Sequence, residues 1–494
     1  MRIGRVVKRQ WLGPVAIAVL VASACGGGSR SFKDGPSAGA SDAGGQDGAF
    51  SGAPGGVGAA AGDDGAIAPG EGGAGVGGSV GGECEPGATR ACYDGSATTR
   101  DTPPCKGGTS ICDEGGTWGA CDGQVLPVTE LCEDGVDNDC NGEVDDVYDI
   151  DFDGWTACEG DCCEVVGAGC TLPALVNPGA IDVQRFSPSG APTFTDDDCS
   201  GTAGDSRAAC DQGVPLDDPA TASAAAAVDV CRSVTQDPRS WGLRSVSYTT
   251  ANGKQIVAGK QAGIAAAFGA QVIPQQGQRM LLLSSGHARP PGHAEACGSN
   301  SCKTGGTSTP PVNFPQQADG CAPVKAIYDS VALELNLRAP SNATGYRFSY
   351  RYWSFAKPGE CDAYSDEFVV IVSPVPPGSM DGNIAFDALG TPISAKSSLF
   401  DICTGCPMGA GPLKDTGFDT WSTSDFPGGA TGWLSSTAPV KPGEEFTLRF
   451  AIWDGGDQAM DSSVLVDNFE WLTESGVEVG TEPLAAAKSQ SLHP

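Results

Sequence analysis

Two acidic loops of the form D-x-D-x-[DN]-G follow one another in the chain, and they limit what this segment can fold into. The first is DNDCNG at residues 137–142, and the second is DIDFDG at residues 149–154. Alternate carboxylates in a tight loop point inward together, and glycine at the sixth position permits the sharp turn. Almost no apolar residues are present to hold such loops. The pattern therefore predicts oxygen ligands around a hard cation, most simply Ca²⁺.

The candidate ligands in these loops are side chains that carry an oxygen at regular spacing. They are Asp137, Asp139, Asn141 and Asp145 in the first loop, and Asp149, Asp151, Asp153 and Asp161 in the second. Asp146 is an alternative to Asp145. The twelfth loop positions lack the glutamate of an EF-hand, and no helical pattern flanks either loop. The alternative interpretation is a set of acidic turns without a metal, because Asp, Asn and Gly are common turn residues.

Calcium is favoured over copper and zinc. Residues 84–286 contain no histidine and a single methionine, Met280, so the soft ligands of copper are lacking unless a thiolate serves. The cysteines of residues 83–131 lack the C-x2-C pairs of a zinc site.

The motif order supports this interpretation. CEDGVDNDCNGEVDD, DIDFDG, C-x-G-D-C and NPGA follow one another between residues 132 and 180. This order resembles the bacterial MopE-like metal-binding motif repeat and is similar to thrombospondin type 3 calcium repeats. The resemblance implies a metal-binding module. The sequence departs from the repeat at Cys163, where an aspartate is usual.

The N-terminus has the pattern of an export signal. Four basic residues precede an apolar run at residues 11–21, and Ala22-Ser23-Ala24-Cys25 follows. This arrangement is typical of a secretory signal, and the run is too short to span a membrane comfortably. The cysteine after small residues resembles a bacterial lipobox, which implies lipidation at Cys25. An ordinary signal peptide or a short membrane anchor are the alternatives.

Composition narrows the class of protein further. The net charge of −32 argues against a nucleic-acid partner, whose phosphates require Lys and Arg. The chain has 21 cysteines, and lipidation of Cys25 leaves an even number. Export to an oxidising compartment makes disulfides the expectation, although their pairing cannot be deduced from sequence.

The second half of the chain has strand periodicity. Apolar residues alternate with others over residues 331–337, 346–352 and 446–452, and strands are also expected near 279–285, 367–373 and 463–471. Such runs, separated by Gly and Pro turns, predict an antiparallel β-sandwich or jelly roll. The alanine-rich stretch at 220–234 predicts one helix.

The fold class is therefore mostly β, with small disulfide-rich modules ahead of the sandwich. The predicted parts are a signal peptide at 1–24, a lipidated flexible Gly/Ala-rich tether at 25–82, a Cys-rich module at 83–131, the acidic region at 132–218, the sandwich at 219–474 and a disordered tail at 475–494.

A second family resemblance covers residues 220–472. It rests on WGLRSVSY, MLLLSSGHA, TGWL, PGEEFTLRFAIWDGGD and DSSVLVDNFEW. These motifs resemble the bacterial choice-of-anchor L domain. The resemblance implies a cell-surface or secreted module and supplies no active site.

Three further groups of residues are candidate sites. Asp454, Asp457 and Asp461 are candidate ligands of a structural Ca²⁺, with a solvated hairpin loop as the alternative. Trp421 and Trp433 are candidates for stacking on sugars, although core packing is the commoner role. His287, His293, Cys297 and Cys302 have zinc-like spacing, but a disulfide is preferred in an exported chain.

These patterns predict a structural or adhesive protein without catalytic activity, anchored by lipid at the cell envelope, on the outer membrane or cell surface. Expected partners are the membrane, through the lipid, and a surface polysaccharide or protein. A carbohydrate-binding module is the alternative function, followed by a secreted hydrolase.

Overall fold

The computed structural model describes residues 83–484, apart from 168–169, 187–190, 319, 360–361 and 420–427. All of them belong to the second of two compact units, Val80–Pro494. The predicted signal peptide, the tether with Cys25, and Trp421 lie outside the described residues. Within the described part, no helix combines the length and the apolar character that a membrane crossing requires.

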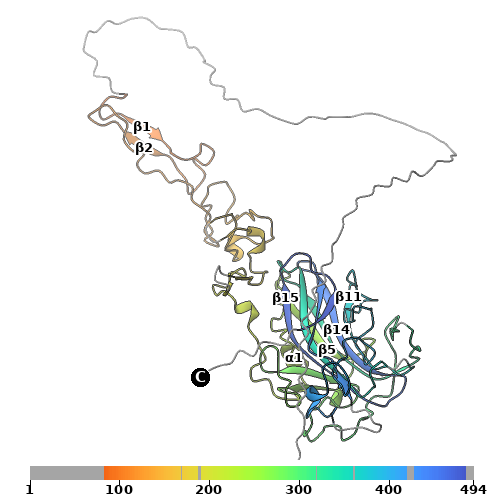
Figure 1. Cartoon of the computed structure of the whole chain (residues 1–494). Helices are drawn as coiled ribbons and strands as arrows, with labels where there is room; N and C mark the ends of the chain where they lie inside the picture. The colour runs from red at the N-terminus through yellow and green to blue at the C-terminus, as the bar shows by residue number, and fades with distance from the viewer. Residues whose placement is uncertain are drawn as a thin grey trace, which may run out of the picture. The chain divides into compact units, whose positions relative to one another are not determined.

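The Cys-rich module is built on one hairpin and three disulfides. Strands β1 (Thr89–Cys92) and β2 (Gly108–Ile111) pair antiparallel (Figure 1). The disulfides are Cys84–Cys112, Cys92–Cys121 and Cys105–Cys140. The last one crosses the predicted boundary at residue 131, so a disulfide cross-links the Cys-rich module to the acidic region.

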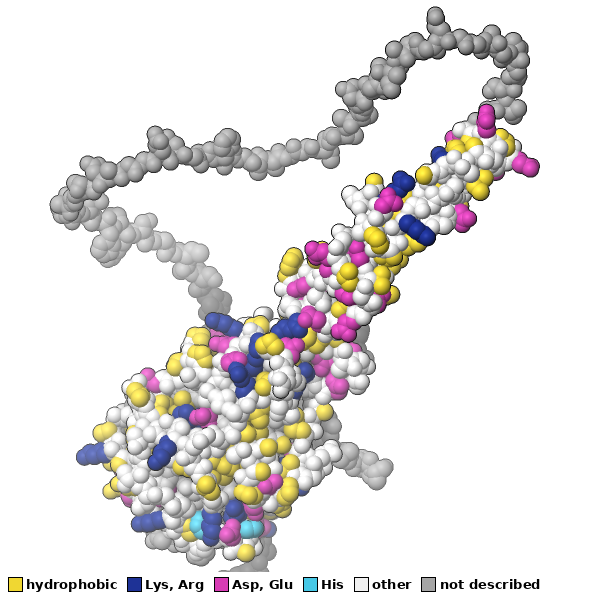
Figure 2. Space-filling view, turned by 180° about the vertical axis from the view of Figure 1, so that it is seen from behind, with side chains coloured by type: hydrophobic (Ala, Val, Ile, Leu, Met, Phe, Trp, Pro, Cys, Tyr) yellow, Lys and Arg dark blue, Asp and Glu magenta, His cyan; other side chains and the backbone are white. Residues whose placement is uncertain are grey.

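The acidic region has little regular structure. Its elements are the short helices η1 (Ala157–Glu159), η2 (Pro173–Leu175) and η3 (Asp205–Arg207), and the strands β3 (Gln184–Phe186) and β4 (Pro192–Phe194). Its disulfides are Cys132–Cys158, Cys162–Cys199 and Cys163–Cys170, and Cys210–Cys231 joins it to the segment that follows. Few apolar side chains are buried here, and acidic side chains lie on its surface (Figure 2). Disulfides and turn hydrogen bonds therefore stabilise this region in place of a large apolar core.

The remainder is a β-sandwich of two antiparallel sheets, as the period-two pattern predicted. The seven-stranded sheet has the order β16-β13-β10-β15-β7-β6, with β12 beside β10. The five-stranded sheet has the order β11-β14-β9-β5, with β8 beside β9. The strands of the first sheet are β6 (Ala262–Ala265), β7 (Met280–Ser284), β10 (Gly345–Ser354), β12 (Gly429–Ala430), β13 (Leu434–Pro439), β15 (Ser462–Leu472) and β16 (Gly480–Pro483). Those of the second are β5 (Gly242–Thr249), β8 (Thr307–Ser308), β9 (Ile327–Arg338), β11 (Glu367–Ser373) and β14 (Glu445–Gly455). Two further short helices are η4 (Gly259–Gln261) and η5 (Gly411–Leu413).

The core lies between the two sheets. Alternate residues of β10 meet aromatic residues of the facing sheet: Tyr346 stacks on Phe446 at 5.0 Å, and Phe348 meets Phe450 edge-on at 4.9 Å. All four rings are buried. Each buried aromatic side chain of this size contributes roughly 1.5–3 kcal/mol relative to exposure, so this layer is a main source of the stability of the sandwich.

Two predicted boundaries were wrong. The helix expected over 220–234 is only α1 (Thr221–Ala226) (Figure 1). It is short because the chain turns at Asp229, whose φ of 65° is left-handed. The tail expected from residue 475 instead contributes β16, which pairs with β13 at the edge of the sheet. Alanine content and terminal position were poor guides in these two places.

Candidate metal sites

The two predicted loops fold in the same way. In the first, the backbone N–H of Asn141 donates to Asp137 and Asp139 at 3.1 and 3.0 Å, and that of Gly142 donates to Asp137 at 3.0 Å. In the second, the N–H of residue 153 donates to residues 149 and 151, both at 3.2 Å, and that of residue 154 donates to residue 149 at 2.9 Å. The predicted inward turn of the alternate carboxylates is therefore present in both.

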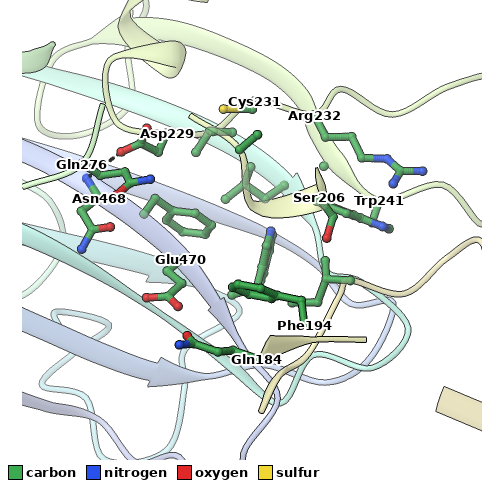
Figure 3. A pocket seen from close by; sticks show the side chains of 17 residues that line it. Gln184, Phe194, Ser206, Asp229, Cys231, Arg232, Trp241, Gln276, Asn468 and Glu470 are labelled. Carbon is green, nitrogen blue, oxygen red and sulfur yellow. Dashed lines mark hydrogen bonds between the residues drawn. The ribbon is translucent and has the colours of Figure 1, made fainter. Parts of the chain in front are cut away.

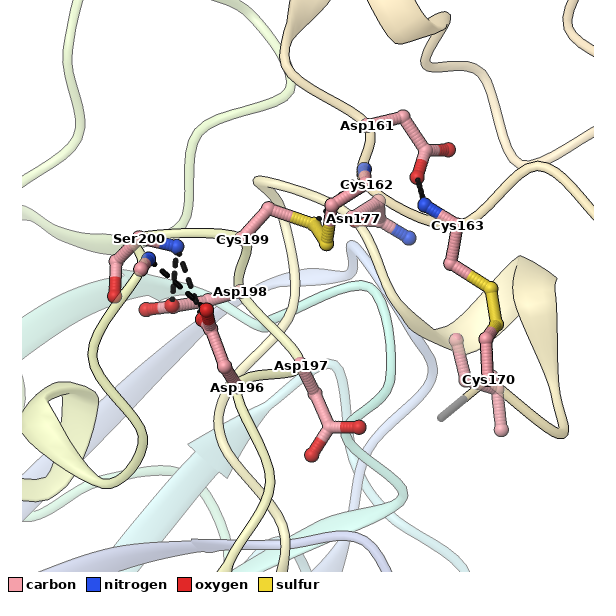
Figure 4. Close-up of a disulfide and its surroundings, with 12 residues drawn as sticks. Asp161, Cys162, Cys163, Cys170, Asn177, Asp196, Asp197, Asp198, Cys199 and Ser200 are labelled. Atoms are coloured by element: carbon pink, nitrogen blue, oxygen red, sulfur yellow. Dashed lines mark hydrogen bonds between the residues drawn. A yellow bond between two sulfur atoms is a disulfide. The ribbon is translucent and has the colours of Figure 1, made fainter. Parts of the chain in front are cut away.

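A third loop with this pattern occurs at residues 196–201, with the sequence DDDCSG. Ser200 N–H donates to Asp196 and Asp198, both at 3.1 Å, and Gly201 N–H donates to Asp196 at 3.0 Å (Figure 4). In each loop the fourth residue is left-handed: Cys140 at φ 60°, Phe152 at 64° and Cys199 at 56°. The sequence of this loop departs from the D-x-D-x-[DN]-G pattern only at its fifth position, which is Ser200 instead of Asp or Asn.

The second loop gathers the densest set of carboxylates. Oxygens of Asp151, Asp153 and Asp161 lie within 4.8 Å of one another, and so do those of Asp149, Asp151 and Glu164. Glu164 was not predicted; it follows the loop too far along the chain for the spacing rule to include it. The clusters at the second loop thus contain all four of its predicted ligands and one additional acid, Glu164.

The electrostatics of this cluster are unfavourable without a counter-charge. Burial, followed by the charge of Asp153, raises the pKa of Asp151 to about 6, and burial is also the main cause that raises the pKa of Asp153 and of Asp161. One buried oxygen each of Asp151, Asp161 and Glu164 has no hydrogen-bond partner in the described structure. A divalent cation would relieve the repulsion and would give these oxygens a partner.

The first loop needs a corrected ligand set. Oxygens of Glu130, Asp139 and Asp146 lie within 4.8 Å of one another. Asp145 is not among them, because its carboxylate accepts hydrogen bonds from the N–H groups of Asp134 and Gly135 and so stabilises a neighbouring turn.

Two other predicted ligands of the first loop also face elsewhere. Asn141 turns its amide nitrogen toward Asp139 and Asp146, while its oxygen accepts from Glu143 N–H. Asp137 uses both carboxylate oxygens on the backbone of the loop. Asp139 is thus the one predicted ligand that the first cluster retains.

The third loop contributes Asp198 to a cluster with Asp182 and Asp205, whose oxygens lie within 4.8 Å of one another. The Cys162–Cys199 disulfide links the fourth residue of this loop to Cys162, which follows the second loop in the chain (Figure 4). Since Cys162 directly follows Asp161, the disulfide fixes one ligand of the second cluster against the third loop.

Hydrogen bonds connect the second loop and its surroundings to the sandwich. Asn177 donates its amide to Asp153 at 2.7 Å and accepts from Ser341 Oγ at 2.8 Å. Arg239 donates to Glu159 at 2.8 and 3.0 Å, and its guanidinium lies 3.8 Å from the ring centroid of Trp155. The second loop is therefore bonded to the domain that follows it.

In the sandwich, the three predicted ligands occupy different environments. Asp454 is 1% exposed, and Asp461 is buried and accepts from Cys302 N–H at 2.7 Å. Asp457 is exposed and accepts from Ala459 N–H, so it stabilises a turn. Asp366, which precedes β11, was missed. It accepts from Gly455 N–H at 3.0 Å and from Ser462 Oγ at 2.6 Å.

Burial dominates the titration of these sandwich acids. It raises the pKa of Asp366 to about 8 and that of Asp461 to about 7. Burial, followed by the charge of Asp366, raises the pKa of Asp454 well above its usual range. None of the three forms an ion pair with a described Lys or Arg.

The zinc-like constellation is not a zinc site, since Cys297 and Cys302 form the disulfide that was preferred for them. His293 lies 3.1 Å from Asp217, and His287 Nδ1 lies 2.8 Å from the carbonyl oxygen of Glu295. Trp433, proposed as an exposed sugar platform, is half-buried and packs against the core around Trp353.

A cavity of about 270 Å³ lies between the acidic region and the sandwich (Figure 3). Gln184, Phe194 and Trp241 are among its lining residues. The guanidinium of Arg232 lies 4.5 Å from the Trp241 ring centroid and covers one face of that ring. This arrangement offers less for sugar stacking than an open aromatic strip would.

Comparison with known families decides the identity of the second half. Residues 244–469 match the choice-of-anchor L domain family. The chain carries a choice-of-anchor L domain. The match runs from within β5 to within β15 and confirms the resemblance found in the sequence. This domain indicates a surface protein.

Other comparisons add little to the choice-of-anchor L assignment. No curated protein matches the chain. Among solved structures, the chain is similar to TmCBM61 in complex with beta-1,4-galactotriose, with 10% identity, a TM-score of 0.19, and coverage of 47% of this chain and 90% of that one. It is also similar to CBM28, a carbohydrate-binding module specific for non-crystalline cellulose, with 9% identity, a TM-score of 0.18, and coverage of 46% and 86%. Scores this low carry no argument about function.

The acidic region lies outside the matched choice-of-anchor L domain. Its resemblance to MopE-like repeats rests on its own motifs and remains a prediction. The loops before the domain and the buried acids inside it are thus two separate groups of candidate cation ligands.

Proposed function

We propose that this is a lipid-anchored surface protein with a structural or adhesive role, and that its acidic region binds calcium. The choice-of-anchor L domain supports a surface location. The lipid anchor is inferred from the sequence at Cys25. A surface polysaccharide or a surface protein is the expected partner of the sandwich.

The observation that carries the calcium proposal is the carboxylate cluster of the second loop. It gathers five acids in two groups of three that share Asp151, with three buried oxygens that lack a partner among the described residues. Ca²⁺ takes six to eight oxygen ligands and accepts irregular geometry, which suits such a set. All cysteines of residues 132–218 are in disulfides, so no thiolate is left there for copper or zinc.

Calcium would do for this region what a hydrophobic core does for the sandwich. Trp155, Ala180 and Ile181 are the buried apolar residues of the described region, apart from its cysteines. An apolar set this small cannot offset the loss of chain entropy on folding. Binding of a cation to the folded form adds stability in proportion to the logarithm of its concentration. We therefore expect the acidic region to be ordered with calcium and loosened without it.

Limited proteolysis of the mature full-length protein tests this proposal. Calcium should protect residues 132–218 from cleavage, and EDTA should abolish the protection. Asp149→Asn combined with Asp151→Asn should abolish it in the presence of calcium. Asp145→Asn is the matched control: it removes the same type of charge from a turn outside the clusters and should keep the protection. Equal cleavage with calcium and with EDTA would refute the proposal.

Lipidation has a separate test. Replacement of Cys25 by Ser should block processing or release the protein into the soluble fraction, because stable anchoring requires acyl chains. Recovery of the wild-type protein as a wholly soluble, unlipidated chain would contradict it.

We also propose that the protein is not an enzyme. General acid–base chemistry needs positioned groups with tuned pKa values in an accessible site. The buried acid Asp454 lies inside the sandwich, and the nearby histidines are bonded to surface loops. Turnover of a polysaccharide that is lost on Asp454→Asn, with folding intact, would overturn this conclusion.

A further inference from the structure

The interior of the sandwich changes from apolar to polar at one end. On five strands, the inward-facing apolar series ends and a buried polar residue stands two positions beyond it. These polar residues are Asp329 beyond Val331, Asp366 beyond Phe368, Asp454 beyond Ile452, Ser462 beyond Val464 and Ser285 beyond Leu283. We call this set the polar layer. Both sheets contribute to it, so it closes the core across its full thickness.

Hydrogen bonds tie the polar layer together across the sheets. Ser462 Oγ donates to Asp366 at 2.6 Å, and Ser462 N–H donates to Ser285 Oγ at 3.0 Å. Tyr352 Oη lies 3.0 Å from Ser462 Oγ. Asp329 accepts from the backbone of residues 304–306 and from the amide of Gln458. Four of the five members of the polar layer thus have hydrogen-bond partners.

Asp454 is the exception. It is 1% exposed, and neither of its carboxylate oxygens has a hydrogen-bond partner among the described residues. The Ser285 hydroxyl lies near, and the nearest charged groups are three more acids: Asp366, Asp461 and Asp329. No described Lys or Arg forms an ion pair with any of these four, and Lys396, close by, donates instead to the carbonyl oxygen of Asp362.

An unpaired carboxylate in such a place has a large free-energy cost. Burial of an ionised group without a partner is unfavourable by several kcal/mol even after relaxation, by the usual order of magnitude. The charge of a neighbouring acid increases this free-energy cost. A hard cation removes the cost, because carboxylate, hydroxyl and carbonyl oxygens are its preferred ligands. The polar layer supplies all three kinds of oxygen.

We propose that the polar layer binds a Ca²⁺ ion, with Asp454 as the central ligand. Among the described residues, no three of these carboxylates have oxygens within 4.8 Å of one another, unlike those of the acidic region. The ligand set is therefore mixed: Asp454, assisted by Asp366 or Asp461, with hydroxyl and carbonyl oxygens of the layer. Asp366 lines a cavity of about 360 Å³ and Asp461 lines another of about 630 Å³, so the ion has routes of entry.

The site is independent of calcium in the acidic region, because its ligands come from different strands and loops. Its role is structural: the ion clamps the ends of β9, β14 and β15 and the residue before β11. In a surface protein, it would make the sandwich itself sensitive to calcium.

The test counts calcium ions on the mature full-length protein by native mass spectrometry after calcium saturation. Asp454→Asn should bind one ion fewer than the wild type and should lose the calcium-dependent part of the melting temperature of the sandwich. Asp457→Asn is the control, since it removes an exposed acid three residues away, and it should bind the wild-type number. An unchanged ion count in Asp454→Asn overturns the proposal.

A second variant covers the case in which Asp454→Asn does not fold. Asp139→Asn, Asp151→Asn and Asp198→Asn together disable the three clusters of the acidic region and leave the sandwich intact. That variant should still bind one calcium ion. Zero bound ions would overturn the proposal of a sandwich site. If the acidic region binds no calcium, the wild type itself would carry the single sandwich ion, so the two proposals fail separately.

Discussion

The most informative single substitution is Asp229→Asn, at a second group of buried acids. Asp211 and Asp467 are fully buried, and Asp229, three residues after α1, is partly buried and interacts with both. Asp229 accepts from Asn468 N–H at 3.2 Å, while one oxygen of Asp211 and one of Asp229 have no partner in the described structure. Three carboxylates from distant parts of the chain therefore lie close together, and none of them forms an ion pair with a Lys or Arg side chain in the part of the chain that the structure describes.

The magnitude follows from the pKa shifts. Burial, followed by the charge of Asp211, raises the pKa of Asp229 to about 6, and burial raises that of Asp467 to about 8. The folded state therefore binds more protons than the unfolded state, in which these groups titrate near 3.9. Stability is greatest below about pH 4 and is lost as the pH rises toward 8. The shift of Asp229 corresponds to at most about 3 kcal/mol.

Asparagine at position 229 removes this loss. It tolerates the left-handed backbone, its oxygen can still accept from Asn468, and its amide can donate to the neighbouring acids. Because Asp229 and Asp467 lie close enough to share protons, we expect a gain of about 1–2 kcal/mol at pH 8, little change at pH 4.5, and a flatter profile between them.

The assay is urea unfolding followed by tryptophan fluorescence at both pH values in EDTA, which removes any contribution from calcium. Asp381→Asn is the matched control, since Asp381 is exposed and also left-handed with a φ of 52°. It should leave the pH profile unchanged. A lower stability of Asp229→Asn at pH 8 would refute the reasoning, because it would show that the charge at position 229 is compensated.

Three further predictions concern the acidic region. Changing both cysteines of the Cys162–Cys199 disulfide to Ala opens a closed loop of 37 residues, which raises the chain entropy of the unfolded state by about 4 kcal/mol. This change should weaken calcium binding in a titration. An unchanged affinity would contradict the link between the second and third loops. Asp151→Asn should stabilise the calcium-free region by about 1 kcal/mol, after allowance for solvent screening, and should destabilise the calcium-loaded region. A melting temperature that shifts in the same direction in both states would count against a ligand role for Asp151. Arg239→Ala removes the contacts with Glu159 and Trp155 and should speed amide exchange in the second loop; unchanged exchange would show that these contacts do not order it.

The strands of the sandwich were predictable because their inward faces are regular. The alternation over 331–337, 346–352 and 446–452 lies within β9, β10 and β14, and burial of every second residue leaves a signal that a short window can detect. The disulfide pairing was not predictable, since Cys105 bonds to Cys140 across an apparent module boundary and nothing in local spacing requires it.

The candidate sites were predictable only where the ligands are close in sequence. Asp149, Asp151 and Asp153 were found because a single turn positions them. Glu164 and Asp366 were missed because tertiary contacts, and no spacing rule, bring them to their clusters. The sequence left Asp145 and Asp146 as alternatives, since two adjacent acids can face opposite sides of a turn, and only the backbone brings Asp146 to the first cluster.

Hydrogen–deuterium exchange of the mature protein, with calcium and with EDTA, tests the central claim most directly. The amides of Gly142, Gly154 and Gly201 each donate to the first aspartate of a loop and report whether that loop is formed. We predict slow exchange of these three amides with calcium and fast exchange in EDTA, while the central residues of β9 stay protected in both. Equal exchange of the three glycine amides in the two conditions would contradict calcium as the element that orders the acidic region.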